Sequence, residues 1–251
     1  MSEEHGSDEF RLDGRVALVT GAGRGIGRGC ARSLAQAGAQ IVAVSRTRSE
    51  LEQVAGELGR GARPEVCDVT DSARVRELIA GLERLDVLVV AAGANLPEPL
   101  LEVRDEHLDA LLALNVRATF VVLQAAARRM VDAGGGSIVL ISSQMGHVGA
   151  PRRSVYCTTK HAVEGLTKAA AVELAPSGVR VNAVAPTFVE TPMTAPFLAD
   201  AGFRAEVERQ IPLGRIGRVE DVTGAVVYLA SDASALVTGT SLRVDGGWTA
   251  Q

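Results

Sequence analysis

The feature that most constrains this 251-residue chain is a regular alternation of short apolar runs with longer helical patterns. Runs rich in Val, Ile, Leu and Ala indicate seven strands, at 16–20, 41–44, 64–67, 87–90, 138–141, 181–184 and 242–244. Helical patterns lie between them, at about 26–37, 48–58, 71–83, 104–133, 154–175 and 219–230. Because strand–helix–strand crossovers are right-handed, this order predicts an α/β fold, a doubly wound sheet of seven parallel strands with helices on both faces.

Length and composition favour one domain. Doubly wound folds often reach about 250 residues as a single unit, and 47% hydrophobic with 22% charged residues is typical of globular proteins. We predict a flexible N-terminal tail over residues 1–11 and a single dinucleotide-binding catalytic domain over 12–251. One long stretch lacks strand character, at about 186–215, and we predict that it forms a partly helical flap over the substrate.

Several classes of protein are disfavoured by the composition. A formal net charge of −4 gives no general attraction to nucleic acid, and the apolar runs fall far short of the ~20 residues of a membrane span. The acidic N-terminus differs from a secretory signal. Three cysteines and four histidines show no metal-ligand spacing. We therefore expect a cytoplasmic protein with no metal, no nucleic-acid partner and no membrane association.

A glycine-rich turn directly follows the first strand and opens a helix. Backbone N–H groups and the helix N-terminus at such a turn can face a pyrophosphate, and glycines allow the close approach. The predicted cofactor residues of the turn are Gly21, Gly23, Arg24, Gly25, Ile26 and Gly27. The alternative is a tight strand-to-helix turn that binds no ligand.

The ends of the next two strands predict the adenosine site. Asp68, followed by Val69, is placed to accept a hydrogen bond from an adenine amino group, with helix capping as the alternative. Ser45 and Arg46 end the second strand, where an acid would instead bind the ribose diol. Arg46 and Arg24 could clamp a 2′-phosphate, so NADP(H) is favoured and NAD(H) stays possible. The alternative is that both arginines are solvated and that the protein uses both cofactors.

A tyrosine and a lysine four residues apart predict acid–base chemistry. On a helix, Tyr156 and Lys160 share one face, so the ammonium can act on the phenol. Bringing a phenol from a pKa of ~10 to ~7 requires roughly 4 kcal/mol. A unit charge ~4 Å away at an effective dielectric of ~20 supplies about that much. We therefore expect Lys160 to lower the pKa of Tyr156.

These motifs together resemble the short-chain dehydrogenase/reductase family in its single-domain form, which implies a Rossmann-type fold. The resemblance covers nearly everything from Leu12 to Trp248. The residues that carry it are Thr20-Gly-x-x-x-Gly25-x-Gly27, Ala92-Gly93, Asn115, Ser143 and Tyr156-x-x-x-Lys160. The family implies an NAD(P)-dependent oxidoreductase that interconverts a secondary alcohol and a ketone.

The resemblance also implies a role for each catalytic residue. Tyr156 would be the general acid in reduction and the general base in oxidation, and Ser143 would hold the substrate oxygen. Lys160 would bind the nicotinamide ribose and lower the Tyr156 pKa. Asn115 would position a water that links Lys160 to bulk solvent. Ala92, Gly93, Tyr156, Lys160, Pro186, Val189 and Thr191 would complete the cofactor site.

Two departures from the family pattern concern the cofactor. Where Asn-Asn-Ala-Gly is frequent, this chain has Val90-Ala91-Ala92-Gly93, which lacks the amide side chains that brace the strand. Where Pro-Gly is usual, it has Pro186-Thr187, at the nicotinamide edge. Neither departure touches the proton-transfer residues.

The substrate is less constrained by the sequence. Ser143 and Tyr156 are joined by Asn95, Met145 and Phe188 as predicted substrate residues, and the segments around them are similar to gluconate 5-dehydrogenases, which implies a sugar acid or polyol. Arg152 or Arg153 could bind a carboxylate, or contact solvent or a second subunit. A 3-oxoacyl carrier-protein reductase is the alternative enzyme, and a non-catalytic dinucleotide sensor is the alternative of another class. Family members are commonly homotetramers, and we expect one here.

Overall fold

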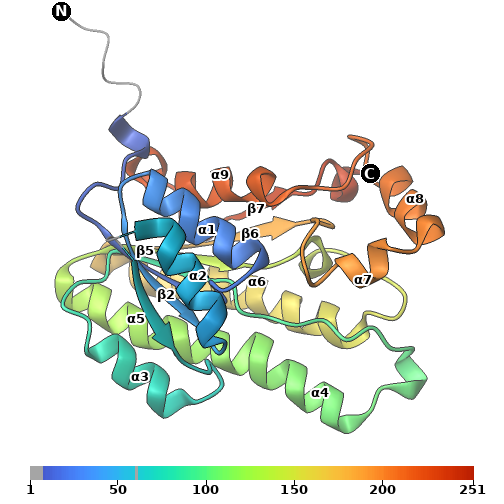
Figure 1. Cartoon of the computed structure of the whole chain (residues 1–251), viewed down its shortest axis with the longest axis horizontal. Coiled ribbons are helices and arrows are strands. Elements are labelled where there is room, and N and C mark those ends of the chain that lie inside the picture. The colour runs from blue at the N-terminus through green and yellow to red at the C-terminus, as the bar shows by residue number, and fades with distance from the viewer. Residues whose placement is uncertain (1–7, 60–61) are drawn as a thin grey trace, which may run out of the picture.

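The computed structural model describes residues 8–59 and 62–251, and its centre is one sheet of seven parallel strands (Figure 1). The strand order is β3-β2-β1-β4-β5-β6-β7. The strands are β1 (Val16–Thr20), β2 (Gln40–Ser45), β3 (Ala62–Val66), β4 (Val87–Val90), β5 (Gly136–Ile141), β6 (Val179–Pro186) and β7 (Ser241–Val244). The predicted doubly wound α/β fold is confirmed.

Helices cover both faces of the sheet (Figure 1). One face packs against α1 (Gly25–Gln36), α2 (Arg48–Leu58) and α9 (Val219–Ala230). The other face packs against α3 (Ser72–Ala80), α5 (Thr119–Ala133) and α6 (Ser154–Leu174). The predicted flap contains α7 (Ala195–Leu198) and α8 (Ala201–Gln210), which lie together beyond the ends of the strands.

The strands are apolar on both sides because both faces of the sheet are covered. Along β1, Leu18 points into one core, while Ala17 and Val19 point into the other, as the two-residue period of a strand requires. All three side chains are buried. Burying a leucine contributes about 1.5–3 kcal/mol, so Leu18→Ala would leave a costly cavity in the centre of the sheet.

Several predicted elements differ in their bounds from those observed, and two of the differences have a clear physical reason. The third strand begins two residues earlier than predicted, at Ala62, and lies at the sheet edge, where Pro64 needs no ladder partner on its outer side. The predicted helix over 104–133 is divided into α4 (Asp105–Leu111), the π-helix η4 (Leu112–Ala118) and α5. Apolar periodicity does not reveal such a change of hydrogen-bond register inside a continuous helix.

The helical stretch Asp105–Ala133 is long and apolar enough to cross a membrane by length and composition. Half of its most apolar window is buried inside the protein, where α5 packs against the sheet. Core helices of globular proteins meet the same criteria, so this helix is weak support for a membrane span.

Short 3-10 turns connect the larger elements. They are η1 (Asp8–Phe10), η3 (Leu100–Glu102), η5 (Gln144–Gly146), η6 (Ala175–Ser177), η7 (Asp232–Ser234) and η8 (Trp248–Ala250). Within the predicted tail over 1–11, the Phe10 ring lies 6.3 Å from that of Tyr228 on α9, and residues 1–7 lie outside the described residues.

The strand order reverses beside β1, which pairs with β2 on one side and with β4 on the other. In doubly wound sheets, ligands bind outside the carboxyl ends of the strands at this switch point. The predicted site residues follow the carboxyl ends of β1, β2, β4, β5 and β6, so the topology brings them to one edge of the sheet.

Candidate active site

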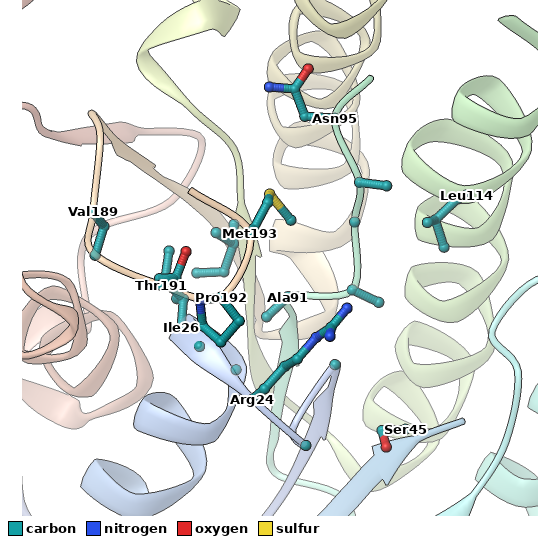
Figure 2. A pocket seen from close by; sticks show the side chains of 18 of the residues that line it. Arg24, Ile26, Ser45, Ala91, Asn95, Leu114, Val189, Thr191, Pro192 and Met193 are labelled. Atoms are coloured by element: carbon teal, nitrogen blue, oxygen red, sulfur yellow. The ribbon is translucent and has the colours of Figure 1, made fainter. Parts of the chain in front are cut away.

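A cleft of about 400 Å³ lies at the carboxyl ends of the strands (Figure 2). It gathers most of the predicted cofactor residues, namely Gly21, Gly23, Arg24, Gly25, Ile26, Gly27, Ser45, Arg46, Val69, Ala92, Gly93, Tyr156, Lys160, Pro186, Val189 and Thr191. Figure 2 shows Asn95 at the opposite end of the cleft from Arg24 and Ser45. The cleft therefore has a nucleotide end at the glycine turn and a substrate end near Asn95.

The glycine turn has the shape that a pyrophosphate needs. Gly21 and Gly25 have φ angles of +67° and +56°, which side chains rarely adopt. A Cβ on Gly27 would collide with the carbonyl of Gly21. Arg24, the residue before α1, makes no side-chain cap, so the first N–H groups of this 12-residue helix are free to bind an anion. The turn fits a dinucleotide phosphate.

Asp68 does not line the cleft. Its Oδ1 accepts hydrogen bonds from the Thr70 N–H at 2.9 Å and the Thr70 hydroxyl at 2.7 Å. Its Oδ2 lies 3.8 Å from an Arg46 nitrogen. Asp68 thus closes a local turn through Oδ1, and its predicted contact with an adenine amino group stays a prediction. The cap of α3 is supplied by Asp71, three residues later.

Glu50 is a cleft residue that the sequence analysis missed. It lies in the first turn of α2, and a Cβ on Gly23 would come within 2.5 Å of its Oε2 and 3.1 Å of the Ser45 hydroxyl. Between β2 and α2, the cofactor residues were predicted from the end of β2 alone. Because α2 begins soon after β2, its first turn faces the same cleft. The nucleotide end therefore carries a carboxylate beside Arg24 and Arg46.

The remaining residues missed by the sequence analysis are mostly neighbours of predicted ones. They are Thr47, Cys67, Ala94, Leu114, Ile141, Ser142, Pro192, Met193 and Thr194. Their types carry no motif, and only the ends of the strands to which they belong could have indicated them.

The three proton-transfer candidates meet at the end of β5. Ser143 follows this strand, and its Oγ accepts a hydrogen bond from the Met145 N–H at 3.2 Å. Tyr156 and Lys160 lie one turn apart on α6, with the Lys160 Nζ 5.6 Å from the centre of the tyrosine ring. Nζ donates a 2.8 Å hydrogen bond to the Ile141 carbonyl. The helix therefore places both residues on the face that the spacing predicted.

Burial sets the direction of the Tyr156 pKa shift, which is opposite to the predicted one. Burial raises the pKa of Tyr156 above its ordinary value, and the opposing causes are a hydrogen bond with Ser143 and the charge of Arg153. Burial also lowers the pKa of Lys160 to about 8, against the charge of Glu164. Desolvation disfavours the charged form of both groups, and it outweighs the expected effect of the lysine on the phenol.

The Asn115 side chain joins two neighbouring segments, and its predicted role in positioning a water near Lys160 stays a prediction. From the π-helix η4, its amide donates to the Ala94 carbonyl at 2.9 Å and to the Thr159 hydroxyl at 3.1 Å, while its Oδ1 accepts from the Ala94 N–H at 2.9 Å. The side chain is thus committed to joining the loop after β4 to α6. A Cβ on Gly93 would lie 3.3 Å from Asn115 Oδ1 and 4.0 Å from Lys160 Nζ, so the two residues are close without direct contact.

At the two positions where the chain departs from the family pattern, the structure shows which groups are present instead. The Thr20 hydroxyl accepts hydrogen bonds from the N–H groups of Ala91 and Ala92, at 3.2 and 3.3 Å, and braces the strand end that lacks asparagines. Thr187 lines the cleft, and among the described residues its hydroxyl has no hydrogen-bond partner. The departure at 187 therefore adds a polar group to the cleft.

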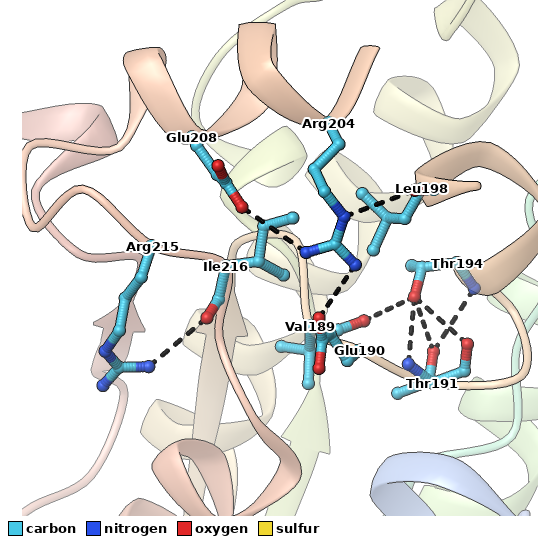
Figure 3. A network of polar contacts seen from close by, with 9 residues as sticks. All are labelled: Val189, Glu190, Thr191, Thr194, Leu198, Arg204, Glu208, Arg215 and Ile216. Carbon is cyan, nitrogen blue, oxygen red and sulfur yellow. Dashed lines mark hydrogen bonds and ion pairs between the residues drawn. The ribbon is translucent and has the colours of Figure 1, made fainter. Parts of the chain in front are cut away.

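The flap begins with a network of polar contacts (Figure 3). The Thr191 N–H donates to the Thr194 hydroxyl at 3.0 Å, and the Thr194 N–H donates to the Thr191 hydroxyl at 3.4 Å. Arg204 of α8 donates to Glu190 at 2.9 Å and to Glu208 at 3.4 Å. These bonds hold the segment that follows Val189 against α8.

Two predicted substrate residues point away from the cleft. The Phe188 ring packs against Phe203 and Trp248, with ring centres 5.7 and 5.8 Å apart, in a small apolar cluster beneath the flap. Met145 is buried outside the cleft lining. Both predictions are therefore not supported, because neighbours in sequence need not point the same way. Asn95 does line the cleft, and its Oδ1 has no partner within residues 8–59 and 62–251.

Comparisons with known proteins agree with this geometry. A family model described as enoyl-(acyl carrier protein) reductase matches residues 21–249. L-Xylulose reductase from Bos taurus is 42% identical over 243 residues, covering 96% of this chain and 99% of that protein. D-Threitol dehydrogenase from Mycolicibacterium smegmatis is 41% identical over 249 residues, covering 96% and 95%. The chain belongs to the short-chain dehydrogenase/reductase family.

A solved structure of the same family is also close. Gluconate 5-dehydrogenase from Burkholderia cenocepacia, in complex with NADP and tartrate, matches with a TM-score of 0.94 at 39% identity, covering 98% of this chain and 100% of that one. This short-chain dehydrogenase/reductase therefore uses a nicotinamide dinucleotide and acts on secondary alcohols, or on ketones in the reverse direction.

The residues of the site have different roles in the reaction. The cofactor, when bound, exchanges a hydride with the substrate carbon. With a pKa at or above its ordinary value, Tyr156 is protonated at neutral pH, so its phenol has a proton to donate to a carbonyl oxygen. Ser143, hydrogen-bonded to Tyr156, can hold the same oxygen. Lys160, buried one turn further along α6, supplies an ammonium whose charge is lost as the pH rises through about 8.

Proposed function

We propose that this enzyme interconverts a secondary alcohol and a ketone on a small polyhydroxylated substrate, a sugar acid or polyol. The supporting observation is a set of buried polar atoms at the substrate end that have no hydrogen-bond partner among the described residues. They are Asn95 Oδ1, Ser142 Oγ and Thr187 Oγ1, all on residues that line the cleft. Each such atom costs about 1–3 kcal/mol when left unpaired, and substrate hydroxyls would satisfy several at once.

The similar proteins support the same substrate class. Their names refer to L-xylulose, D-threitol and gluconate, all small molecules with several hydroxyl groups. An acyl thioester offers few hydrogen-bonding groups to these atoms. The observation therefore favours a sugar-type substrate over the carrier-protein substrate of the alternative enzyme.

The test is a substrate panel followed through the 340 nm absorbance of the reduced cofactor. We expect turnover of ketopentoses, keto-aldonates or the corresponding alcohols to exceed that of acetoacetyl thioesters by at least 100-fold in kcat/KM, about 3 kcal/mol. Faster turnover of the thioester would assign the alternative enzyme. Tight cofactor binding with no turnover of any substrate would instead indicate a dinucleotide sensor.

NADP(H) is the cofactor that we favour. Arg24 and Arg46 both line the nucleotide end, where planar guanidinium groups could hold a 2′-phosphate. We expect kcat/KM to be at least 10-fold higher with NADPH than with NADH, and Arg46→Ala to remove most of that difference. Equal values for the two cofactors in the wild-type enzyme would exclude the clamp.

We further propose a cytoplasmic homotetramer with no nucleic-acid or membrane partner. Helices α5 and α6 carry apolar side chains that are exposed in the single chain, with Phe120 48% and Val172 80% exposed. Subunit contacts through these helices would cover them. Native mass spectrometry should find four chains, and a stable monomer would contradict the assembly.

A further inference from the structure

Arg153 is an arginine buried at the catalytic end of the protein, and one of its nitrogens has no hydrogen-bond partner among the described residues. It precedes α6 and lies three residues before Tyr156, and only 8% of its surface is exposed. In the part of the chain that the structure describes, its Nη1 makes no hydrogen bond and no carboxylate forms an ion pair with it. A buried cation that lacks a hydrogen-bonded counter-ion is unfavourable, so this arrangement fits a guanidinium that binds an anion.

A second buried arginine shows what a structural role requires. Arg180 on β6 is similarly desolvated, since burial lowers the pKa of both guanidinium groups. Its nitrogens, however, donate to the carbonyls of Val237, Leu229 and Ser231 at 3.2, 2.9 and 3.1 Å. Arg180 is therefore satisfied by the protein itself, whereas Arg153 is not.

The surroundings of Arg153 connect it with the substrate end. The Phe197 ring of α7 covers the guanidinium at 5.2 Å, and the flap residues just before it, Met193 and Thr194, line the cleft. On the other side, Arg153 is close enough to Tyr156 for its charge to influence the phenol. The guanidinium thus lies between the catalytic tyrosine and the flap.

The backbone beside Arg153 is held in an unusual conformation. Arg152 has a φ angle of 61°, which is rare for a residue other than glycine. Its carbonyl accepts a hydrogen bond from the Glu98 N–H at 3.1 Å, which joins the loop that carries Asn95 to the start of α6. Such strain is typical of functional sites, and here it fixes the direction in which Arg153 enters the protein.

A contact with a second subunit does not explain Arg153. The unpartnered Nη1 is buried within the single chain, so a neighbouring protein surface cannot reach it. A small anion that enters under the flap, as Phe197 moves aside, can reach it. The planar guanidinium suits a carboxylate, which accepts two parallel hydrogen bonds.

We propose that Arg153 binds the carboxylate of the substrate beneath Phe197, so that the enzyme prefers sugar acids to neutral polyols. The inference rests on the proposed function and narrows it to an anionic class of substrate. Arg153 is a specificity residue, and the proton-transfer residues act in the same way on acids and on polyols.

The first test compares a matched pair of substrates, an aldonate and the alditol of equal length. In Arg153→Gln, kcat/KM for the aldonate should fall about 100-fold, as expected for losing a charged hydrogen-bonded pair, and the fall for the alditol, which loses only the effect of the Arg153 charge on Tyr156, should be at least 10-fold smaller. Equal losses on both substrates would overturn the proposal. A wild-type enzyme that turns over neither would refute the proposed function instead.

A second measurement does not depend on activity. Removing an uncompensated buried charge should raise the thermal midpoint of Arg153→Gln by a few degrees, whereas the matched variant Arg180→Gln should have a lower midpoint. A lower midpoint for both variants would assign Arg153 a structural role and overturn the proposal.

A third measurement uses the wild-type enzyme and stays decisive if the variant fails to fold. Tartrate and threitol have the same carbon skeleton and differ in their carboxylates. With cofactor present, tartrate should inhibit at least 10-fold more strongly than threitol, and Phe197→Ala should preserve this order. Equal inhibition by the two compounds would overturn the proposal.

Discussion

The two ends of the cleft are built in opposite ways. The nucleotide end is made largely of backbone, where the glycine turn and the uncapped start of α1 offer N–H groups. The substrate end is made of side chains, and several buried polar atoms there, including Asn95 Oδ1 and Arg153 Nη1, have no partner in the described regions.

The difference separates what is shared within the family from what is specific to this protein. A backbone cradle is dictated by glycines and fits the same phosphate group in every relative. Unpaired buried side chains reduce stability and are retained where a ligand satisfies them. The substrate end therefore carries the information about the reaction that this protein performs.

The largest expected effect concerns the substrate end. Tyr156→Phe removes the proton donor and should lower kcat about 1,000-fold, as is typical of general acid–base residues. Cofactor affinity, measured by fluorescence titration, should change little. Tyr228→Phe is the matched control, because the chain has only these two tyrosines and Tyr228 lies on α9. Activity in Tyr156→Phe close to that of the control would remove the tyrosine from the mechanism.

The next effect concerns the nucleotide end. Gly27→Ala places a methyl group against the Gly21 carbonyl, and overpacking of this kind typically costs about 1–3 kcal/mol. We expect cofactor affinity to fall by at least 10-fold. Gly56→Ala on α2 is the control, since a Cβ there meets no atom within 4 Å and alanine favours a helix. Equal cofactor affinities in the two variants would show that the turn does not cradle the phosphates.

A third effect tests the stability cost of the catalytic lysine. Its folded-state pKa of about 8 lies below the ordinary 10.5, so the folded protein binds fewer protons than the unfolded chain between these pH values. The free energy of unfolding should therefore rise with pH in this window, by about 2 kcal/mol between pH 7.5 and 9.5. Raising the pH above 10 should oppose this gain, because the pKa of Tyr156 is raised in the folded state.

Chemical denaturation at pH 7.5 and 9.5 measures this contribution. Lys160→Met should lose the pH-dependent gain, whereas Lys168→Met, at an exposed position of the same helix, should keep it. The same pH dependence in both variants would contradict the lowered pKa of Lys160.

The smallest effect concerns charge at the nucleotide end. Glu50→Gln removes a carboxylate that faces the predicted 2′-phosphate site, so the ratio of kcat/KM for NADPH to that for NADH should rise. A partly exposed charge is worth up to about 1 kcal/mol, which corresponds to about 5-fold. Glu52→Gln, exposed on the same helix, should leave the ratio unchanged. A falling ratio in Glu50→Gln would indicate that Glu50 does not oppose the phosphate.

The sequence predicted the fold and the nucleotide end well, because both depend on local patterns. Strand–helix alternation specifies the sheet, and the glycines of the turn are required by the backbone itself. Tyr156 and Lys160 were found because helix geometry places residues four apart on one face.

The remaining features depend on packing that no local pattern encodes. The pKa of Tyr156 follows from its burial, and the position of Glu50 follows from how closely α2 approaches the glycine turn. Phe188 was assigned to the substrate by its place in the chain, but the apolar cluster with Phe203 and Trp248 turns it away. Arg153 was recognised as a possible carboxylate ligand, while the lack of a partner for its Nη1 is visible only in three dimensions.

The π-helix between α4 and α5 makes the active site unusually sensitive to the length of the chain. Each residue of a helix advances the direction of the side chains by about 100°, so deleting one residue before Asn115 would restore ordinary α-helical register and swing its amide away from Ala94 and Thr159. A one-residue deletion that most surface helices tolerate would here break the hydrogen bonds through which Asn115 joins the loop after β4 to α6. Among homologous chains, the stretch between these segments should therefore tolerate substitutions far better than insertions or deletions.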